Sequence, residues 1–428
     1  MLRAPVGSAV FVALASLACG PSVPTYHQDV APLLAARCTN CHQAGGAAPF
    51  ALGSYEQVKP MAKAIVAAVE AGRMPPWTAG PSDIGYLRNP TLTAEQLATL
   101  KQWETAGSQA GDTRAKPKEI AAIGGGIERV DLELSMPEPY TPSASPDDYR
   151  CFVLKWPKNE PVYVTGFNAI PGVPAMAHHI ALYLVPPDSA ALPVAWDAED
   201  ATPGYSCFGG PFGNRPQQFA VELINAWIPG YQGVKLPRGR GILVPPGATV
   251  VLQMHYNVQT GAQPDLSKLQ FTLEPKVDKR ASYQPLLDIA WVAGGMHIPG
   301  GEKAVVHQHV SDPREFFKLL GSPLDNSKGF NIEAVMFHMH RLGTVGELWL
   351  EKADKRRIKL LSIPRYDFHW QLEYYFEQPV RFEEGDKLRV RCTFDNSQER
   401  TGKAKPADVN WGENSDEEMC VANLLSTE

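Results

Sequence analysis

Apolar positions in the N-terminal part of the chain recur at spacings typical of short amphipathic helices. We predict helices over Val30–Arg37, Tyr55–Ala71 and Leu92–Gly107. Thr93 is a suitable N-cap for the third helix, because its hydroxyl can accept a hydrogen bond from a free amide of the first turn. The pattern predicts a small helical domain, and the polar, glycine-rich stretch that follows, up to Arg129, predicts a linker.

From Val130 onward the pattern changes to short apolar runs that are broken by proline, glycine and asparagine. Strands are predicted at runs such as Val162–Thr165, Ile180–Val185, Thr249–Tyr256, Ala334–Gly343 and Leu348–Leu350. Because no long helical periodicity interrupts these runs, the pattern favours antiparallel sandwiches or jelly rolls. The length allows two such units with a boundary near Glu274–Arg280, and the 36 glycines and 38 prolines fit a turn-rich, mostly β chain.

Composition and charge narrow the class of protein. A chain of 428 residues predicts two or three domains, and 44% hydrophobic with 20% charged residues is typical of globular proteins. The net charge is −6 and no basic block occurs, so nucleic acid is not an expected partner.

The N-terminus has the pattern of a secretory signal peptide. One positive charge at Arg3 precedes the apolar run Val10–Ala18, which is too short to span a bilayer. We therefore expect an exported protein of the bacterial periplasm. Cys19 follows Ala18 and is a candidate acceptor for a lipid anchor, although Ser16 stands where leucine is usual. Ordinary cleavage without an anchor is the alternative.

The motif Cys38-Thr39-Asn40-Cys41-His42 predicts a covalently attached haem c. Two thiols at this spacing add to the haem vinyl groups, and the following histidine becomes the proximal iron ligand. A zinc or redox CxxC is the alternative, but neither requires the adjacent histidine. Export also suits the four cysteines left for disulfides, Cys151, Cys207, Cys392 and Cys420, whose pairing the sequence does not prove.

The second axial iron ligand should be a methionine or a histidine. Met74 is our choice, because the prolines after it hold an extended loop that can present a side chain to a haem face. Met61 lies in an amphipathic helix and is expected in the core, and His27 is the remaining competitor. An iron open on this side is a further alternative.

Several histidines in the β part are candidate metal ligands. His338 and His340 lie two apart in a predicted strand, so their imidazoles can share a face. The same spacing in His307-Gln308-His309 is interpreted as surface. His178 and His179 are neighbours, which one ion can use together only at a strand end or a bulge. With His255 they make three imidazoles, which suit copper or zinc. Met419 offers a thioether that, with the two imidazoles of His338 and His340, favours copper over zinc. Read one by one, each of these residues is more often structural.

The ordered set resembles a known family. The segments are Val251–Tyr256 with His255, His338-Met339-His340-Arg341-Leu342-Gly343, and Glu418-Met419-Cys420, with His178-His179 upstream. They are similar to copper type II, ascorbate-dependent monooxygenases, which include peptidylglycine α-hydroxylating and dopamine β-monooxygenase. The resemblance covers about Leu132–Leu425 and implies two jelly-roll domains that face each other across a solvent-filled cleft.

The expected organisation is mostly β, with two jelly-roll β-sandwich domains preceded by a small α-helical cytochrome c domain. The predicted ranges are a signal peptide at 1–20, a cytochrome c-like domain at 21–110, a linker at 111–129, a trihistidine copper sandwich at 130–277 and a His-His-Met copper sandwich at 278–428.

The resemblance also implies site residues and an activity. His178, His179 and His255 match the ligands of the electron-storing copper, and His338, His340 and Met419 match those of the copper that binds oxygen and performs catalysis. The family's cysteine beside the methionine ligand pairs with an upstream cysteine that Cys392 matches, so Cys392–Cys420 is the preferred disulfide and Cys151–Cys207 remains. His369 is then expected to be structural.

The implied reaction is hydroxylation of a C–H bond of a small organic substrate with O2, using two copper ions. The amidating members carry an arginine where this chain has Met336 and a tyrosine where it has Asn423, so a glycine-extended peptide is not an expected substrate. The apolar Met336 and Phe337 suggest a less charged substrate. Electrons would come from a periplasmic donor through the haem. One alternative is a non-catalytic haem and copper protein that transfers electrons or binds copper. Another is a carbohydrate- or partner-binding sandwich whose histidines are core residues.

Overall fold

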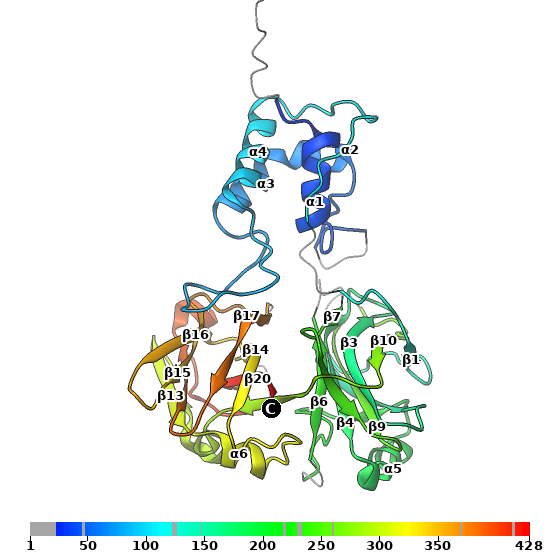
Figure 1. Cartoon of the computed structure of the whole chain (residues 1–428), viewed down its shortest axis with the longest axis vertical. Helices are drawn as coiled ribbons and strands as arrows, with labels where there is room; N and C mark the ends of the chain where they lie inside the picture. The colour runs from blue at the N-terminus through cyan, green and yellow to red at the C-terminus, as the bar shows by residue number, and fades with distance from the viewer. Residues whose placement is uncertain are drawn as a thin grey trace, which may run out of the picture.

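The computed structural model describes residues 23–44, 48–121, 126–145, 147–216, 220–228, 233–258, 261–368, 370–412 and 416–428. The signal peptide, Cys19 and His369 lie outside these residues, so the predictions made for them stay predictions. Four short helices gather at one end of the molecule, and two bodies made mostly of strands lie side by side beneath them (Figure 1). The prediction of a mostly β chain is confirmed.

The helices of the N-terminal part lie close to their predicted ranges. They are η1 (Tyr26–Val30), α1 (Ala31–Arg37), α2 (Tyr55–Val58), η2 (Lys59–Met61), α3 (Ala62–Glu70) and α4 (Ala94–Thr105). The second predicted helix tightens into a 3-10 turn around Pro60, which has no amide hydrogen to donate. Thr93 caps α4 as predicted, because its side chain accepts from the amide of Gln96. Leu33, Leu34 and Trp103 fill the small core between these helices.

The first β body packs two sheets around one core, as in a β-sandwich. One sheet has the order β1 (Leu132–Ser135), β10 (Lys268–Glu274), β3 (Val162–Ile170) and β8 (Arg240–Val244), with β7 (Val234–Lys235) beside β3. The other has the order β5 (Tyr205–Ser206), β2 (Asp147–Lys155), β9 (Thr249–Asn257), β4 (Ala177–Val185) and β6 (Glu222–Trp227). Phe152, Leu252 and Phe271 lie fully buried between the two sheets. The helices η3 (Pro187–Ser189) and α5 (Ala191–Glu199) follow β4.

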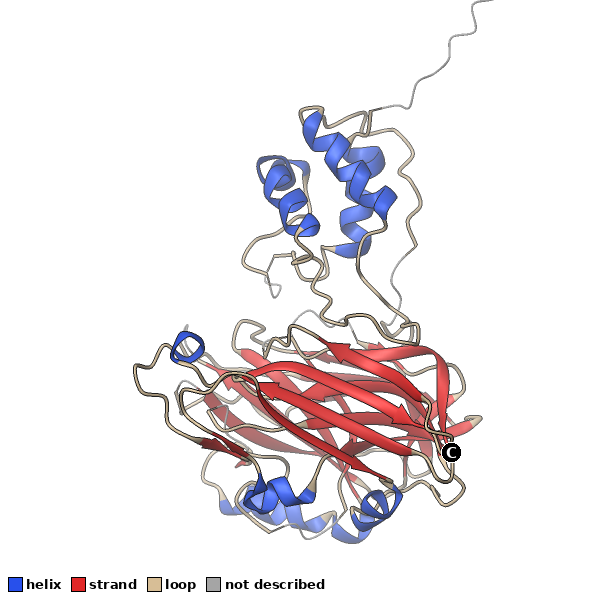
Figure 2. Cartoon of the chain, turned by 90° about the vertical axis from the view of Figure 1, so that its left-hand side faces the viewer, coloured by secondary structure: helices blue, strands red, loops and turns tan. Residues whose placement is uncertain are grey.

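The second β body repeats this arrangement, and Figure 2 shows the strands of the molecule as stacked layers. One sheet has the order β11 (Lys279–Leu286), β20 (Val421–Thr427), β14 (Phe330–His338) and β17 (Glu373–Phe382). The other has the order β13 (Val305–Ser311), β18 (Lys387–Phe394), β15 (Gly343–Glu351) and β16 (Arg357–Ile363). The remaining elements are η4 (Trp291–Gly295), β12 (His297–Ile298), α6 (Arg314–Leu319), α7 (Gln398–Thr401) and β19 (Val409–Asn410). A short parallel pairing of β8 with β11 joins the two bodies through their sheets.

One strand ends earlier than its sequence predicted. We expected Ala334–Gly343 to continue as a strand, but β14 ends at His338 and His340 lies in the turn that follows. The buried carboxylate of Glu418 accepts the amides of His340 and Leu342, at 2.8 and 2.5 Å. These side-chain bonds replace strand pairing after His338, so the argument that both histidines share one strand face is wrong.

A segment of the N-terminal part is built into the second β body. Residues 77–88, which we call the strap, follow the loop after α3 and pack against its core through Trp77, Ile84 and Tyr86. The amide of Gly80 donates to Ser362 and that of Leu87 donates to Tyr375, at 2.7 and 2.8 Å. The helical part is therefore fixed on the β part rather than tethered by a free linker. No helix within the described ranges is long and apolar enough to cross a bilayer.

Candidate functional site

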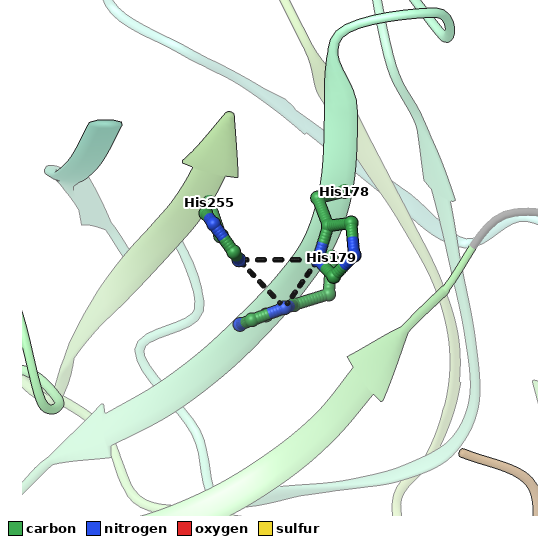
Figure 3. A group of neighbouring side chains, drawn as sticks. All are labelled: His178, His179 and His255. Atoms are coloured by element: carbon green, nitrogen blue, oxygen red, sulfur yellow. Dashed lines mark hydrogen bonds between the residues drawn. The ribbon is translucent and has the colours of Figure 1, made fainter. Parts of the chain in front are cut away.

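Three histidines of the first β body converge on one point (Figure 3). The Nδ1 atoms of His178 and His179 lie 3.4 Å apart, and the Nδ1 of His255 lies 3.2 and 3.1 Å from them. His255 is on β9 and pairs across the sheet with His179 on β4. The register shifts between Ala177 and His179, and this irregularity lets two neighbouring histidines serve one site, as the sequence required.

The geometry of the three nitrogens fits a metal ion. Metal–nitrogen bonds of roughly 2.0–2.1 Å at tetrahedral or trigonal angles place the nitrogens about 3.3–3.6 Å apart. The observed separations of 3.4, 3.2 and 3.1 Å are close to this range, two of them slightly shorter. A neutral ring nitrogen either donates or accepts, so the three cannot all satisfy one another by hydrogen bonds. His255 also uses its Nε2 on Asp147 Oδ1 at 3.0 Å, which leaves Nδ1 for an ion. The residues present fit copper.

The surroundings of His179 disfavour its charged form. Burial, followed by the neighbouring His255 and His178, holds the pKa of His179 well below its ordinary value. The hydrogen bond from His255 lowers the pKa of Asp147, so this carboxylate stays charged and supports the ring it accepts from. The Tyr149 ring stacks on His255 at 4.0 Å between centroids and fixes its plane. Neutral, oriented imidazoles are the form that binds metal.

The second group comes from the other β body. The rings of His338 and His340 lie 5.0 Å apart at 86°. His338 Nδ1 is 2.6 Å from Gln371 Oε1 and His340 Nδ1 is 3.1 Å from the Glu417 carbonyl, so both Nδ1 atoms donate and both Nε2 atoms are left for an ion. Burial lowers the pKa of His338, against the opposing effect of Gln371.

Met419 reaches the same cavity from the start of β20. It follows Glu418, which holds the His340 turn, and β20 pairs Val421 with His338. The disulfide Cys392–Cys420 ties this end of β20 to β18 of the opposite sheet, as preferred from the resemblance. The structure therefore brings His338, His340 and Met419 to one place, with the methionine held by its neighbours in the chain.

His178 and His179 line one cavity of about 280 Å³ together with His338, His340 and Met419, whereas His255 is buried behind its wall. The ring of Phe368 stands between the two groups, 5.7 Å from the ring of His178 and 6.1 Å from that of His340. Met336 and Asn423, which are cross-strand partners, also line the cavity. Phe337 does not, because it points into the core of the second body, so the expectation that it shapes the substrate site is wrong. No Asp, Glu, Lys or Arg side chain lines the cavity in the described part of the chain.

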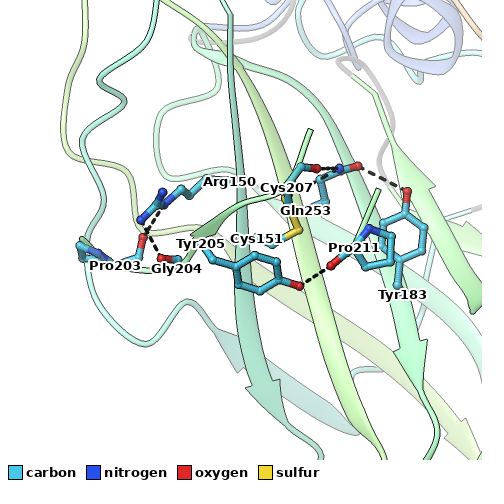
Figure 4. Close-up of a disulfide and its surroundings, with 9 residues drawn as sticks. All are labelled: Arg150, Cys151, Tyr183, Pro203, Gly204, Tyr205, Cys207, Pro211 and Gln253. Atoms are coloured by element: carbon cyan, nitrogen blue, oxygen red, sulfur yellow. Dashed lines mark hydrogen bonds between the residues drawn. A yellow bond between two sulfur atoms is a disulfide. The ribbon is translucent and has the colours of Figure 1, made fainter. Parts of the chain in front are cut away.

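A second disulfide supports the cavity wall (Figure 4). Cys151–Cys207 remained after the preferred pair was chosen, and the structure contains it. The carbonyl of Cys207 accepts a hydrogen bond from the Gln253 side chain at 2.8 Å. Gln253 lines the cavity, and so does Gly209, two residues after Cys207. The bridge thus holds the loop after β5 against the trihistidine side of the cavity.

The CxxCH motif lines a separate cavity of about 610 Å³ in the helical part. Cys38 and Cys41 are free thiols, and His42 Nδ1 donates to the Phe50 carbonyl at 3.1 Å, which leaves Nε2 for iron. Apolar side chains such as Leu52, Ile65 and Val69 form the wall. The residues present fit a covalently attached haem.

The two candidate methionines for the haem iron both line this cavity. Met74 is 42% exposed, and Met61, which we expected in the core, is only partly buried. His27 is not among the lining residues. Asp367 and Trp370, from the loop between β16 and β17, also line the cavity, which nothing in the sequence indicated.

The other pair of histidines with this spacing, His307 and His309, has different contacts from the site histidines. His307 and His309 are half-buried rather than fully on the surface. His307 Nε2 contacts the His297 carbonyl at 3.0 Å, and His309 Nδ1 contacts Asp288 at 3.0 Å. Neither belongs to the trihistidine group. Spacing alone therefore does not identify a metal ligand.

Comparison with known families agrees with the second ligand group. Residues 289–425 match the family model described as copper type II ascorbate-dependent monooxygenase, C-terminal domain. The matched range contains His338, His340, Met419 and both cysteines of the Cys392–Cys420 disulfide. The C-terminal β body is therefore similar to the C-terminal domain of copper type II ascorbate-dependent monooxygenases.

Proposed function

We propose that this protein is a copper-dependent monooxygenase that hydroxylates a C–H bond of a small organic molecule with O2. The observation that carries the proposal is that His178 and His179, which cluster with the buried His255, line the same cavity as His338, His340 and Met419. Two copper ions would be held there. Bound copper supplies one-electron redox chemistry and the activation of O2.

The chain's own residues prepare both groups before any ion binds. Asp147 and Gln371 fix the ring orientation of His255 and His338, so each presents one chosen nitrogen to the cavity. A thioether in the second group and only imidazoles in the first give the two sites different softness. We assign catalysis to the group with Met419 and electron storage to the trihistidine group.

The cavity favours a small, uncharged substrate. Met336, two residues before His338 on β14, pairs with Asn423 on β20, and both line the cavity wall. Met336 offers apolar surface and Asn423 offers an amide, so the pair can hold an apolar body with one polar group. The absence of charged side chains from the described wall disfavours a carboxylate ligand.

We further propose that a haem c, attached through Cys38 and Cys41 with His42 on the iron, supplies the electrons. Met74 is the proposed second axial ligand. The strap fixes the helical part on the second β body, which keeps a donor permanently close to the copper groups. Stopped-flow reduction of the haem should give copper-dependent reoxidation with O2 and substrate present, and no reoxidation would contradict this part of the proposal.

The activity is tested by metal content and isotope labelling. Purified protein should contain two coppers and one iron per chain. With extracts of small molecules under ¹⁸O2, mass spectrometry should show a product that gains one labelled oxygen, and copper removal should abolish it. A protein that binds both metals and never consumes O2 with candidate substrates would instead be an electron-transfer or copper-binding protein.

The location of the protein is also part of the proposal. We propose export to the bacterial periplasm, with a lipid anchor at Cys19, from the N-terminal pattern alone. A periplasmic electron donor is the partner this location implies. Cell fractionation of wild type and Cys19→Ser checks both points, because loss of the anchor should release the protein into the soluble periplasmic fraction.

A further inference from the structure

One short segment borders both the haem cavity and the copper cavity. We call residues 366–371 the bridging segment, of which His369 lies outside the described residues. Asp367 and Trp370 line the cavity of the CxxCH motif, whereas Phe368 and Gln371 line the cavity of the two ligand groups. Side chains one residue apart in this loop therefore face two different sites.

At the haem end, Trp370 joins the two parts of the molecule. Its ring is part of the wall that also contains Cys41 and His42. Its Nε1 donates to the carbonyl of Pro76 at 3.3 Å, two residues after Met74. This indole in the wall of the haem cavity therefore comes from the second β body and not from the helical part.

At the copper end, the next residue contacts a ligand directly. Gln371 Oε1 lies 2.6 Å from His338 Nδ1, and Gln371 Nε2 donates to the Phe368 carbonyl at 3.0 Å. The hydroxyl of Tyr366 donates to the carbonyl of Met339 at 2.6 Å and accepts its amide at 2.9 Å. The segment is thus locked to the residue that separates His338 from His340.

We propose that the bridging segment carries electrons from the haem to the His338/His340/Met419 group, entering at Trp370 and leaving through Gln371 and His338. The inference rests on the proposed function and adds the point of entry. In each passage one electron leaves the ferrous haem and reduces one Cu(II) to Cu(I), with no bond formed or broken. Two passages supply the two electrons of one hydroxylation.

The electron-storing role assigned to the trihistidine group would suggest that this group receives the electron first. The contacts of the bridging segment indicate the other group. Phe368 reaches His178 by a ring contact of 5.7 Å, whereas Gln371 reaches His338 by a hydrogen bond of 2.6 Å next to Trp370 in the chain. The continuous covalent and hydrogen-bonded connection therefore leads to the methionine-containing group, which receives the electron first.

The test follows the haem, not the product. In holoprotein loaded with Cu(II), the haem is reduced by a flash from an external photosensitiser, and its absorbance and the copper EPR signal are recorded. Gln371→Leu should slow haem reoxidation roughly 10- to 100-fold, the usual loss when an outer partner of a ligand is removed. Gln371→Glu, which keeps an acceptor for His338, should restore most of the rate. The haem midpoint potential should be the same in all three proteins.

Three further variants identify the copper group that accepts the electron and control for loosening of the interface. His179→Ala, which disrupts the trihistidine group, should keep fast reoxidation, whereas His340→Ala should abolish it. Tyr86→Phe removes a hydrogen bond from the strap to the Leu360 carbonyl, at a residue that does not line either cavity, and its reoxidation rate should match wild type.

The outcomes separate this inference from the proposed function. Wild-type reoxidation rates in Gln371→Leu, or loss of reoxidation in His179→Ala but not in His340→Ala, would overturn the route while hydroxylation still stands. A wild-type haem that never reoxidises in the presence of bound Cu(II) would instead overturn the haem supply itself, and the route with it.

Discussion

The two ligand groups reach the same cavity by different structural means. The trihistidine group sits on two paired strands, where the β4–β9 register and one irregularity place all three rings. The methionine-containing group has only His338 on a strand. His340 lies in a turn and Met419 precedes β20, and both depend on Glu418 and a disulfide for their position. Sheet pairing fixes one group, and side-chain anchors fix the other.

This difference predicts unequal sensitivity. A ligand on a central strand loses its position only if the sheet opens, whereas a ligand in a turn moves when its anchors are removed. The predictions below test this contrast from the largest expected effect to the smallest.

Removing the thioether should have the largest effect. Met419→Ala should lower the hydroxylation rate by more than about 100-fold, because even loss of an outer partner of a ligand typically costs roughly 10- to 100-fold. The circular dichroism spectrum and the copper bound by the trihistidine group should not change. Met296→Leu, a buried methionine of the same β body that lines neither cavity, is the matched control. Wild-type rates for Met419→Ala would remove this residue from the catalytic group.

Removing each disulfide in turn separates the two groups. Cys392→Ser with Cys420→Ser opens a loop of 28 residues and should cost about 3–4 kcal/mol of unfolding free energy on the chain-entropy estimate. Copper affinity should fall at the methionine-containing group, because Cys420 is next to Met419. The control pair, Cys151→Ser with Cys207→Ser, should destabilise the first β body and leave that affinity unchanged. Equal copper loss in both double variants would contradict the contrast.

Weakening an outer partner tests the strand-held group. Asp147→Ala removes the acceptor of His255 Nε2 and should reduce copper affinity there roughly 10- to 100-fold. Asp147→Asn keeps an acceptor and should lose less. Competition titration with a copper chelator measures both groups in the same sample, so the methionine-containing group serves as the internal reference.

The smallest effect concerns the contact between the two β bodies. Glu222 on β6 lies 3.5 Å from Arg280 on β11, and burial raises its pKa to about 7 although Arg280 and Ser282 oppose this. The folded state then binds more protons than the unfolded state above the ordinary glutamate pKa. Stability from this group is present below about pH 4.5 and is lost as the pH rises through about 7.

Glu222→Gln removes this titration. As the pH rises from about 5 to 8, the thermal midpoint of wild type should fall relative to that of Glu222→Gln. A difference that stays constant over this range would show that the carboxyl titrates at its ordinary pKa.

The sequence anticipated element types better than it anticipated where elements end. The helices, the cap at Thr93 and the strands around His179 and His255 follow from local spacing, which the residues themselves carry. The end of β14 at His338 does not, because it depends on Glu418, which is distant in the chain and accepts amides that a longer strand would have paired. Local sequence patterns cannot predict a hydrogen-bond acceptor that only the folded chain brings next to the strand.

The same limit applies to the supporting residues of the site. The ligands were visible as an ordered set of histidines and a methionine, but Asp147, Gln371 and Phe368 carried no recognisable spacing. Their roles arise from the pairing of β2 with β9 and from the loop between β16 and β17. The position of Trp370 at the cavity of the CxxCH motif was likewise not predictable, because it depends on a contact with Pro76, which is distant in the chain.

The strap has a consequence for how the molecule can be divided. Trp77 and Tyr86 pack beside Tyr374, whose hydroxyl meets Thr78 at 2.6 Å, so aromatic side chains from the helical segment complete a hydrophobic interior made mostly by residues hundreds of positions later. A shortened protein that begins after residue 129 would leave that interior open on one side. The helical part and the C-terminal sandwich are therefore joined by side-chain packing as well as by the chain, and exchanging either part alone between proteins would break these contacts.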